Sequence, residues 1–340
     1  MLYVGMDVHQ QSTTFCIFDG TTGEIRVITR PTSAGHYAEV LQPLSRQCRV
    51  AFEVGPQAQW VARIVRPLAA EVQVANPALI PWLFRSGRKN DRLDAQKLAT
   101  LLYLGQLPTV HLPPADVSLW RELIQYRRSL VHEQTRIKNR IHALLRSEAL
   151  RCPQRSCWTR AGRVWLRALS FARARQVVLT NLLSRLDATQ RSLRQVQREL
   201  DQIAEHQPLV ALLRTVPGVG PRTAEAIAAF TDDPRRFRDR KRYASYFGLT
   251  PTEHSSGTLQ RRGRISRRGP SVVRWVLAEA VHQAVRRNGV IRAYYERLCR
   301  GRGDRRKKAL VGTARKLLTV CYAMLRDGTV FDPARFQRAA

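Results

Sequence analysis

The stretch LYVGMDVHQQSTTFCIFDGTTGEIRVIT, residues 2–29, decides how the first part of the chain folds. It contains three short runs rich in β-branched and aromatic residues, over residues 2–7, 13–18 and 24–29. Such runs predict strands, and the dipeptides Asp19-Gly20 and Thr22-Gly23 are typical of tight turns. We therefore expect three antiparallel strands joined by hairpins.

The residues that follow alternate between helical and strand patterns. We predict a helix over 34–44, a strand over 50–54, a second helix, a strand over 71–75 and a helix over 91–104. Together with the three strands, this gives the order βββαβαβα, which matches the ribonuclease-H-like (RuvC-like) α/β fold. We expect this domain to occupy residues 1–112.

Residues 113–205 change to a repeat of about 3.5 residues, which is typical of a central α-helical coiled coil. The repeat runs through Leu123, Leu130, Ile137, Ile141 and Leu144, and again through Leu179, Leu182, Leu186, Thr189, Leu193, Val196, Leu200 and Ile203. The break from Cys152-Pro153 to Thr159 predicts an antiparallel helical hairpin. A dimerising coiled coil and a two-helix packing unit within one chain fit this pattern equally well. Residues 206–340 predict a mainly α-helical C-terminal domain.

The charge of the chain points to a polyanionic partner. The 340 residues include 58 Lys and Arg against 26 Asp and Glu, which leaves a net charge of +32. A basic surface binds nucleic acid because cations on the protein release the counterions condensed on the phosphates. An arginine-rich proteome explains part of the excess, but acidic residues are also sparse and the arginines cluster.

Composition also sets expectations about the location of the protein. No run of about 18 apolar residues is present, and the N-terminus lacks the layout of a secretion signal. We expect no membrane partner and a cytoplasmic, nucleoid-associated protein. The six cysteines are scattered through periodic segments, so we expect reduced thiols rather than a zinc site or disulfides.

Four acidic residues in the first domain are candidates for a catalytic metal site: Asp7, Glu53, Asp91 and Asp94. Asp7 ends the first strand, and Glu53 ends a strand that the fold would place beside it. Asp91 and Asp94, three residues apart at a helix start, can point the same way. Such oxygen ligands can hold two divalent ions roughly 3.5 to 4 Å apart. Each acid alone also suits a strand end or a helix cap, but their conjunction favours a metal site.

A second candidate site lies in residues 247–269, which match neither a helix nor a strand pattern. Ser255-Ser256-Gly257 suits a nucleophile that attacks a phosphodiester, and it is also an ordinary turn. Five arginines follow and are expected to contact nucleic acid: Arg261, Arg262, Arg264, Arg267 and Arg268. Gly218 and Gly220 lie in a stretch similar to the hairpin of helix-hairpin-helix modules, whose amides bind phosphate, and a simple turn between helices fits it nearly as well.

Three acidic motifs carry a resemblance to a known family, and the resemblance extends over nearly the whole chain. Gly5-Met6-Asp7, Phe52-Glu53-Val54-Gly55 and Lys89-Asn90-Asp91-Arg92-Leu93-Asp94-Ala95 are similar to the acidic motifs of the DEDD transposases of insertion-sequence family one-ten, which includes the pilin-inverting recombinase. Lys89-Asn90 departs from the lysine-threonine often found before the third acid. The resemblance implies that the four acids bind Mg²⁺, two ions per site, with Mn²⁺ as a substitute.

The same resemblance implies a mechanism. It identifies Ser256, rather than Ser255, as the nucleophile, and no role is assigned to His254. It implies an insertion-sequence transposase or site-specific recombinase that cuts and rejoins DNA through a phosphoserine intermediate. It further implies a homodimer or homotetramer whose protomers share active sites, and a structured guide RNA. The alternatives are a junction-resolving nuclease, whose carboxylates activate water, and a non-catalytic nucleic-acid-binding protein.

Overall fold

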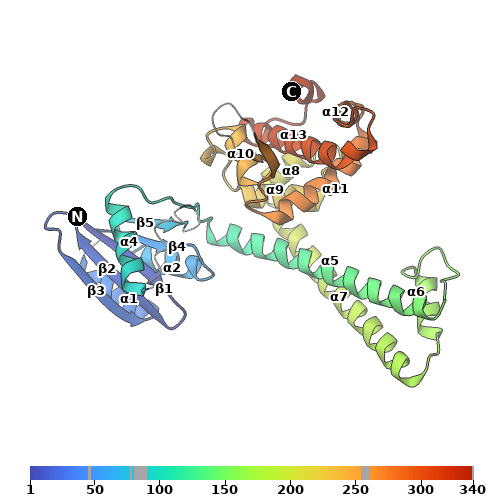
Figure 1. Cartoon of the computed structure of the whole chain (residues 1–340), viewed down its shortest axis with the longest axis horizontal. Coiled ribbons are helices and arrows are strands. Elements are labelled where there is room, and N and C mark those ends of the chain that lie inside the picture. The colour runs from blue at the N-terminus through green and yellow to red at the C-terminus, as the bar shows by residue number, and fades with distance from the viewer. Residues whose placement is uncertain (45–46, 77–78, 80–89, 254–260, 339–340) are drawn as a thin grey trace. The chain divides into compact units, whose positions relative to one another are not determined.

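The computed structural model of the chain describes residues 1–44, 47–76, 79, 90–253 and 261–338. It divides into two compact units, Met1–Ala115 and Asp116–Ala340 (Figure 1). The boundary expected near residue 205 falls inside the second unit, so the separation of residues 113–205 from 206–340 stays a prediction.

The first unit is built on a five-stranded mixed sheet with the order β3-β2-β1-β4-β5. Its strands are β1 Leu2–Val8, β2 Ser12–Asp19, β3 Ile25–Pro31, β4 Cys48–Glu53 and β5 Glu71–Ala75. β1, β2 and β3 pair antiparallel, whereas β4 pairs parallel with both β1 and β5. All five predicted strands are confirmed, and the strand that carries Glu53 lies beside the strand that carries Asp7.

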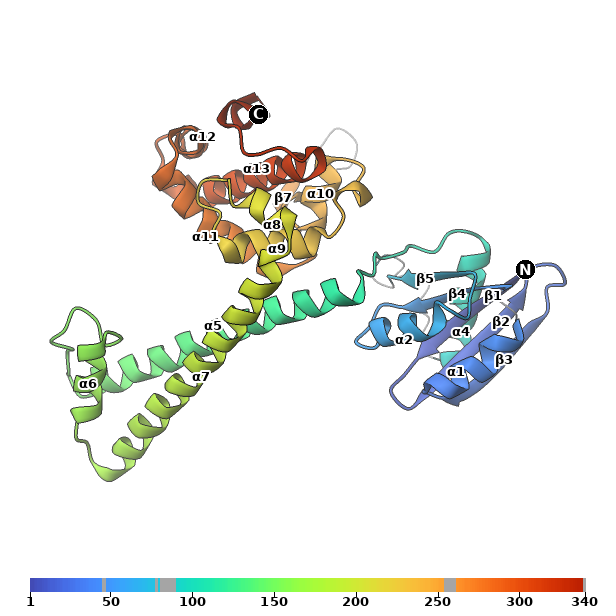
Figure 2. The same ribbon diagram turned by 180° about the vertical axis from the view of Figure 1, so that it is seen from behind.

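Helices cover both faces of this sheet. α1 (Ala34–Leu41) and α2 (Ala58–Val65) pack on one face against a buried core that includes Met6 and Phe52. α4 (Asp91–Tyr103) lies on the other face, across β1, β2 and β4. Figure 1 looks onto the α4 face and Figure 2 onto the face of α1 and α2. Because side chains alternate along a strand, each strand has residues that point towards α1 and α2 and residues that point towards the face of α4.

The second unit begins with a helical arm. α5 (Ala115–Ser147) and α7 (Arg173–Glu205) are each 33 residues long, and α6 (Arg160–Ala168) lies between them in the chain. Towards the far end of the arm, Ile141 of α5 and Leu186 of α7 are buried in one cluster with Leu166 of α6. The expected break between the two long helices is therefore present and contains an additional helix.

The rest of the second unit is helical, as expected. It comprises α8 Pro208–Leu213, α9 Pro221–Thr231, α10 Arg240–Tyr246, α11 Ser271–Arg287, α12 Gly289–Cys299, α13 Arg306–Asp327 and α14 Pro333–Arg338, with short 3-10 turns at Pro234–Arg236 and Gly303–Arg305. Leu277 of α11 and Leu317 of α13 are fully buried in its core. Ile124 of α5 and Leu200 of α7 join the same core, so the near end of the arm is anchored in this helical domain.

One expectation about this unit is wrong. Residues 247–269 were expected to form neither helix nor strand, yet β6 (Pro251–Glu253) and β7 (Arg262–Ile265) pair antiparallel. The flanks continue the pairing, because the Ser266 amide donates to the Thr250 carbonyl at 2.8 Å. These strands contain proline, glycine and arginine rather than alternating apolar residues, so the pairing comes from tertiary context instead of strand propensity.

Two expectations from composition can be compared with the structure. No helix within the described residues has the length and apolar character needed to cross a membrane. All six cysteines lie in the described part of the chain, and all are free thiols, as expected.

Candidate active site

Parallel pairing of β1 and β4 positions two of the predicted acids. Met6 pairs with Phe52, so Asp7 and Glu53 follow at the next position of neighbouring strands. Paired parallel strands lie about 4.8 Å apart, and in-register side chains point to the same face. Asp7 and Glu53 therefore share the carboxyl edge of the sheet, and both are partly buried.

Gly5 brings α4 close to this edge. A Cβ atom on Gly5 would collide with the Ala95 carbonyl oxygen and would lie only 2.6 Å from the Ala99 amide nitrogen. Because glycine has no side chain, the backbone of α4 rests directly on β1. Asn90 caps this helix by accepting a hydrogen bond from the Arg92 amide at 3.1 Å. The first turn of α4, with its two acids, is thereby held near the end of β1.

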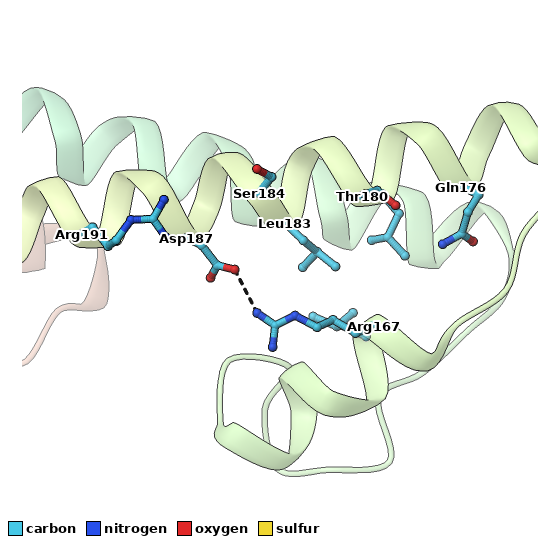
Figure 3. A pocket seen from close by; sticks show the side chains of 9 residues that line it. Arg167, Gln176, Thr180, Leu183, Ser184, Asp187 and Arg191 are labelled. Carbon is cyan, nitrogen blue, oxygen red and sulfur yellow. Dashed lines mark hydrogen bonds and ion pairs between the residues drawn. The ribbon is translucent and has the colours of Figure 1, made fainter.

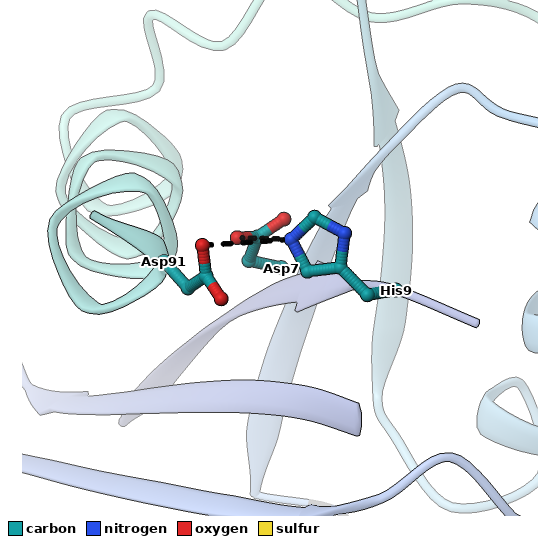
Figure 4. A group of neighbouring side chains, drawn as sticks. All are labelled: Asp7, His9 and Asp91. Carbon is teal, nitrogen blue, oxygen red and sulfur yellow. Dashed lines mark hydrogen bonds and ion pairs between the residues drawn. The ribbon is translucent and has the colours of Figure 1, made fainter. Parts of the chain in front are cut away.

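Asp7, His9 and Asp91 form a compact group of possible metal ligands (Figure 4). One ligand atom from each lies within 4.8 Å of the others. His9 Nε2 is 3.2 Å from Asp7 Oδ2 and 3.6 Å from Asp91 Oδ1. The Asp7 side chain is only 15% exposed, whereas those of His9 and Asp91 are 44% and 49% exposed. The group is thus anchored at a partly buried carboxylate and opens towards solvent.

The environment of Asp7 disfavours its ionised form. Burial is the main cause that raises the pKa of Asp7, and the neighbouring carboxylates Asp91 and Asp94 raise it further. The charge of His9 and its hydrogen bond act in the opposite direction. Like charges at short range repel, and a divalent cation between them would relieve that repulsion. The donor set and its electrostatics therefore fit a divalent metal ion.

The other two acids lie beside this group rather than within it. Asp94 Oδ1 is 3.0 Å from the Lys97 ammonium, and its side chain is 15% exposed. Its charge is the smallest of the causes that raise the pKa of Asp7. Glu53 is placed by strand register and is not part of the three-ligand group found among the described residues. The structure thus brings Asp7 and Asp91 together, with Asp94 and Glu53 nearby.

His9 is a residue that the sequence patterns did not single out. It lies two positions after Asp7, and its amide donates to the Ser12 carbonyl at 3.0 Å where the chain turns into β2. Residues two apart on an extended chain point to the same side. The spacing Asp7-Val8-His9 was therefore the available signal, but it is too common to identify a ligand by itself.

The serine candidates lie outside the described residues, as does His254. The described flanks of their segment are tied together by Arg274 of α11. Its Nη1 donates to the carbonyl oxygens of Phe247 at 3.1 Å, Arg268 at 2.8 Å and Gly269 at 3.2 Å. Of the predicted nucleic-acid contacts, Arg261, Arg264, Arg267 and Arg268 are exposed, and Arg262 begins β7. One guanidinium therefore joins both ends of the segment that carries the serines.

The predicted hairpin glycines occupy the turn between α8 and α9. Gly218 has a φ of +85°, and a Cβ there would lie 2.7 Å from the Ala280 carbonyl oxygen and would collide with the Ala284 amide nitrogen. Close packing on α11 therefore explains this glycine. Gly220 is exposed at the N-terminus of α9 with open space around it. Phosphate binding by the turn stays a prediction.

The fold and the site together define a class of protein. A mixed sheet with acidic residues at the carboxyl edge of its central strands and on the helix that covers them is the arrangement expected of a ribonuclease-H-like nuclease domain. Residues 4–149 match the family model of DEDD transposases of the IS110 type, and residues 210–296 match the model described as "Transposase IS116/IS110/IS902 family". The chain belongs to this family of transposases, which are enzymes that act on DNA. The ribonuclease-H-like fold is thereby confirmed, and the DEDD domain indicates use of a divalent metal.

Individual relatives agree with the family models. The chain is 28% identical over 286 residues to a putative transposase, y4qE, of Sinorhizobium fredii, covering 82% of this chain and 70% of that protein. It is 26% identical over 299 residues to a probable family 20 transposase of Pseudomonas aeruginosa, covering 84% and 86%. An uncharacterized protein of insertion element IS110 from Streptomyces coelicolor is 33% identical over 167 residues, covering 48% and 41%.

Proposed function

We propose that this chain is the transposase of an insertion sequence, and that it cuts and rejoins DNA with the four acids and a serine nucleophile. The observation that carries the proposal is the convergence of Asp7 and Asp91, from distant parts of the sequence, on one partly buried and mutually repelling pair of carboxylates. The two carboxylates repel each other unless a cation lies between them. Divalent cations bound in this way catalyse phosphoryl transfer.

We propose Mg²⁺ as the metal, held by Asp7 and Asp91 with Glu53 and Asp94 beside them. The oxygen donors of these acids match the ligands that Mg²⁺ prefers. When bound, Mg²⁺ would polarise and orient the scissile phosphate. Mn²⁺ is the expected substitute, because the imidazole nitrogen of His9 suits a transition metal better than Mg²⁺.

In the proposed reaction, the Ser256 hydroxyl oxygen attacks the scissile phosphorus. A bond forms between that oxygen and phosphorus, the bond from phosphorus to the 3′ oxygen breaks, and the serine proton is transferred so that a free 3′ hydroxyl results. The phosphoserine ester conserves the bond energy, so a second DNA 3′ hydroxyl can reverse the step without a nucleotide cofactor. The exposed arginines Arg264, Arg267 and Arg268 would hold the flanking phosphates.

Further parts of the proposal rest on the family resemblance alone. The acids of one protomer and the serine of another would meet in one site of a homodimer or homotetramer. α5 and α7 would form the coiled coil that supports this assembly, and a structured guide RNA would select the DNA sites.

The proposal is tested by trapping the protein on DNA. A duplex labelled at the 3′ end of the cleaved strand should stay attached to the wild-type chain after denaturation, and Ser256→Ala should abolish both the adduct and cleavage. Ser255→Ala is the matched control and should retain both. Undiminished cleavage by Ser256→Ala would instead indicate a nuclease that uses water. Cleavage that survives Asp7→Asn would remove the proposed metal site from the reaction.

A further inference from the structure

The far end of the helical arm carries a large excess of positive charge. We define the arm tip as residues 136–194, which comprise the end of α5, all of α6 and most of α7. It contains 14 Lys and Arg residues but only two acidic residues, Glu148 and Asp187. A positive charge of this density favours a polyanion as the binding partner of the arm tip.

The cations gather around one carboxylate. Arg167 of α6 donates to Asp187 of α7, with 2.9 Å between Nη2 and Oδ2 (Figure 3). Arg163 pairs with the same carboxylate through Nη2, and its Nη1 donates to Gln190 Oε1 at 2.7 Å. Arg191 lies one helical turn beyond Asp187 on α7 (Figure 3). A single carboxylate is therefore shared by two guanidinium groups, those of Arg163 and Arg167.

A cavity of about 400 Å³ opens beside this cluster, between α6 and α7. Its polar lining consists of the guanidinium-bearing Arg167 and Arg191, the amide of Gln176, the hydroxyls of Thr180 and Ser184, and Asp187. Figure 3 shows these side chains along one side of α7, with Arg167 facing them from α6. Guanidinium and hydroxyl donors of this kind match the oxygens of a phosphate group.

The cations of the cluster destabilise one another. Burial lowers the pKa of Arg163, and the charges of Arg167 and Arg194 lower it further. Lys138, whose ammonium lies 5.2 Å from the ring centre of Trp158, has its pKa lowered by burial and by Arg163. An additional anion in the cavity would relieve this repulsion, just as Asp187 does in part.

We propose that the α6–α7 cavity binds a backbone phosphate of duplex DNA and thereby docks the arm tip on DNA outside the cleavage site. About 30 Å of helix separates Ile124, in the core of the helical domain, from Leu145 at the tip. That length corresponds to roughly nine base pairs of B-DNA. This inference requires that DNA is the substrate, but it does not require the serine mechanism.

The test compares two arginines that differ in their surroundings. Arg167 and Arg185 are 54% and 55% exposed, and each pairs with a carboxylate. Arg185 has its own partner, Glu133, at 3.3 Å, whereas Arg167 shares Asp187 with Arg163. The full-length chain would be titrated with duplex DNA at several salt concentrations. Arg167→Gln should weaken binding several-fold and reduce the salt slope by about 0.9, while Arg185→Gln should change neither.

Asp187→Asn should change DNA affinity in the opposite direction. Removal of the competing carboxylate should tighten binding to long duplexes and leave binding to short duplexes, which cannot reach the arm tip, unchanged. Thermal unfolding of each variant identifies any that fails to fold. Equal effects of Arg167→Gln and Arg185→Gln would overturn the proposal, as would a loss of binding seen only with duplex RNA. It would also be overturned if Arg167→Gln altered self-association, measured by light scattering, without altering DNA affinity.

Discussion

At the scale of single residues, the chemistry of the candidate site depends on the position of Asp7. It ends β1 with a partly buried side chain, and Asp91 and Asp94 lie close enough to raise its pKa. A carboxyl whose pKa is raised on folding costs stability when it ionises, so the free energy of unfolding falls as pH rises from the ordinary pKa of 3.8 to the raised one. Without metal, the site therefore opposes folding at neutral pH.

Asp7→Asn should reverse this cost. Without a divalent ion at pH 7, we expect the variant to unfold at a temperature equal to or above that of the wild type, because a repelling charge is removed. The wild type should be stabilised by Mg²⁺, by about 2.7 kcal/mol at one hundred times Kd, and the variant should not. Because protons compete with the metal for Asp7, Mg²⁺ affinity should rise with pH through the raised pKa. Calorimetry with and without Mg²⁺ measures both effects, and equal stabilisation of the two proteins would contradict the assignment.

At the scale of elements, the packing of α4 on β1 connects the fold to the site. Gly5→Ala should cost about 1 to 3 kcal/mol through overpacking, because its Cβ would meet the backbone of α4. The displaced helix should also move Asp91 away from Asp7, so Mg²⁺-dependent stabilisation should disappear. Gly35→Ala, in open space on α1, is the control and should retain the metal response. Urea unfolding with and without Mg²⁺ distinguishes the outcomes, and an intact metal response in Gly5→Ala would show that α4 is not held by this contact.

The pair β6 and β7 is the second element on which function is expected to depend. Arg274→Met removes three hydrogen bonds that join the two ends of the serine segment. We expect the rate of adduct formation to fall while DNA affinity stays the same, with partial recovery in Arg274→Lys. Arg292→Met is a matched control, because Arg292 also donates to two backbone carbonyls, Val285 and Arg286, but in another part of the domain. A parallel loss of DNA affinity would indicate a phosphate contact instead.

At the scale of the whole molecule, the proposed acids and serine belong to different compact units. A mixture of Asp7→Asn and Ser256→Ala chains tests whether sites form across protomers. In a mixed assembly, the intact acids of one chain and the intact serine of the other would form a working site, so DNA cleavage should return although each variant alone is inactive. Gel assays of cleavage with the mixed proteins measure this. Continued inactivity, with mixed assemblies shown to form, would place each site within one chain.

The sequence by itself determined the five strands of the first unit and marked the four acids as candidates. Strand alternation and turn residues act over a few neighbouring positions, so residues 2–29 already predict β1 to β3, and the order of later elements predicts the sheet. The acidic motifs could be recognised for the same reason, since each is short and contiguous. The family models confirm what those motifs implied about the class of enzyme.

Only the tertiary structure decided which side chains meet. His9 joins Asp7 and Asp91 because Gly5 lets α4 approach β1, and β6 pairs with β7 although neither has a strand-like pattern. The shared carboxylate of Asp187 likewise depends on how α6 packs against α7. A periodic pattern can be recognised over many residues even where single positions depart from it. A ligand group, in contrast, depends on distances of a few ångströms between residues that are far apart in the chain. Long-range packing sets those distances, and a local pattern does not encode them.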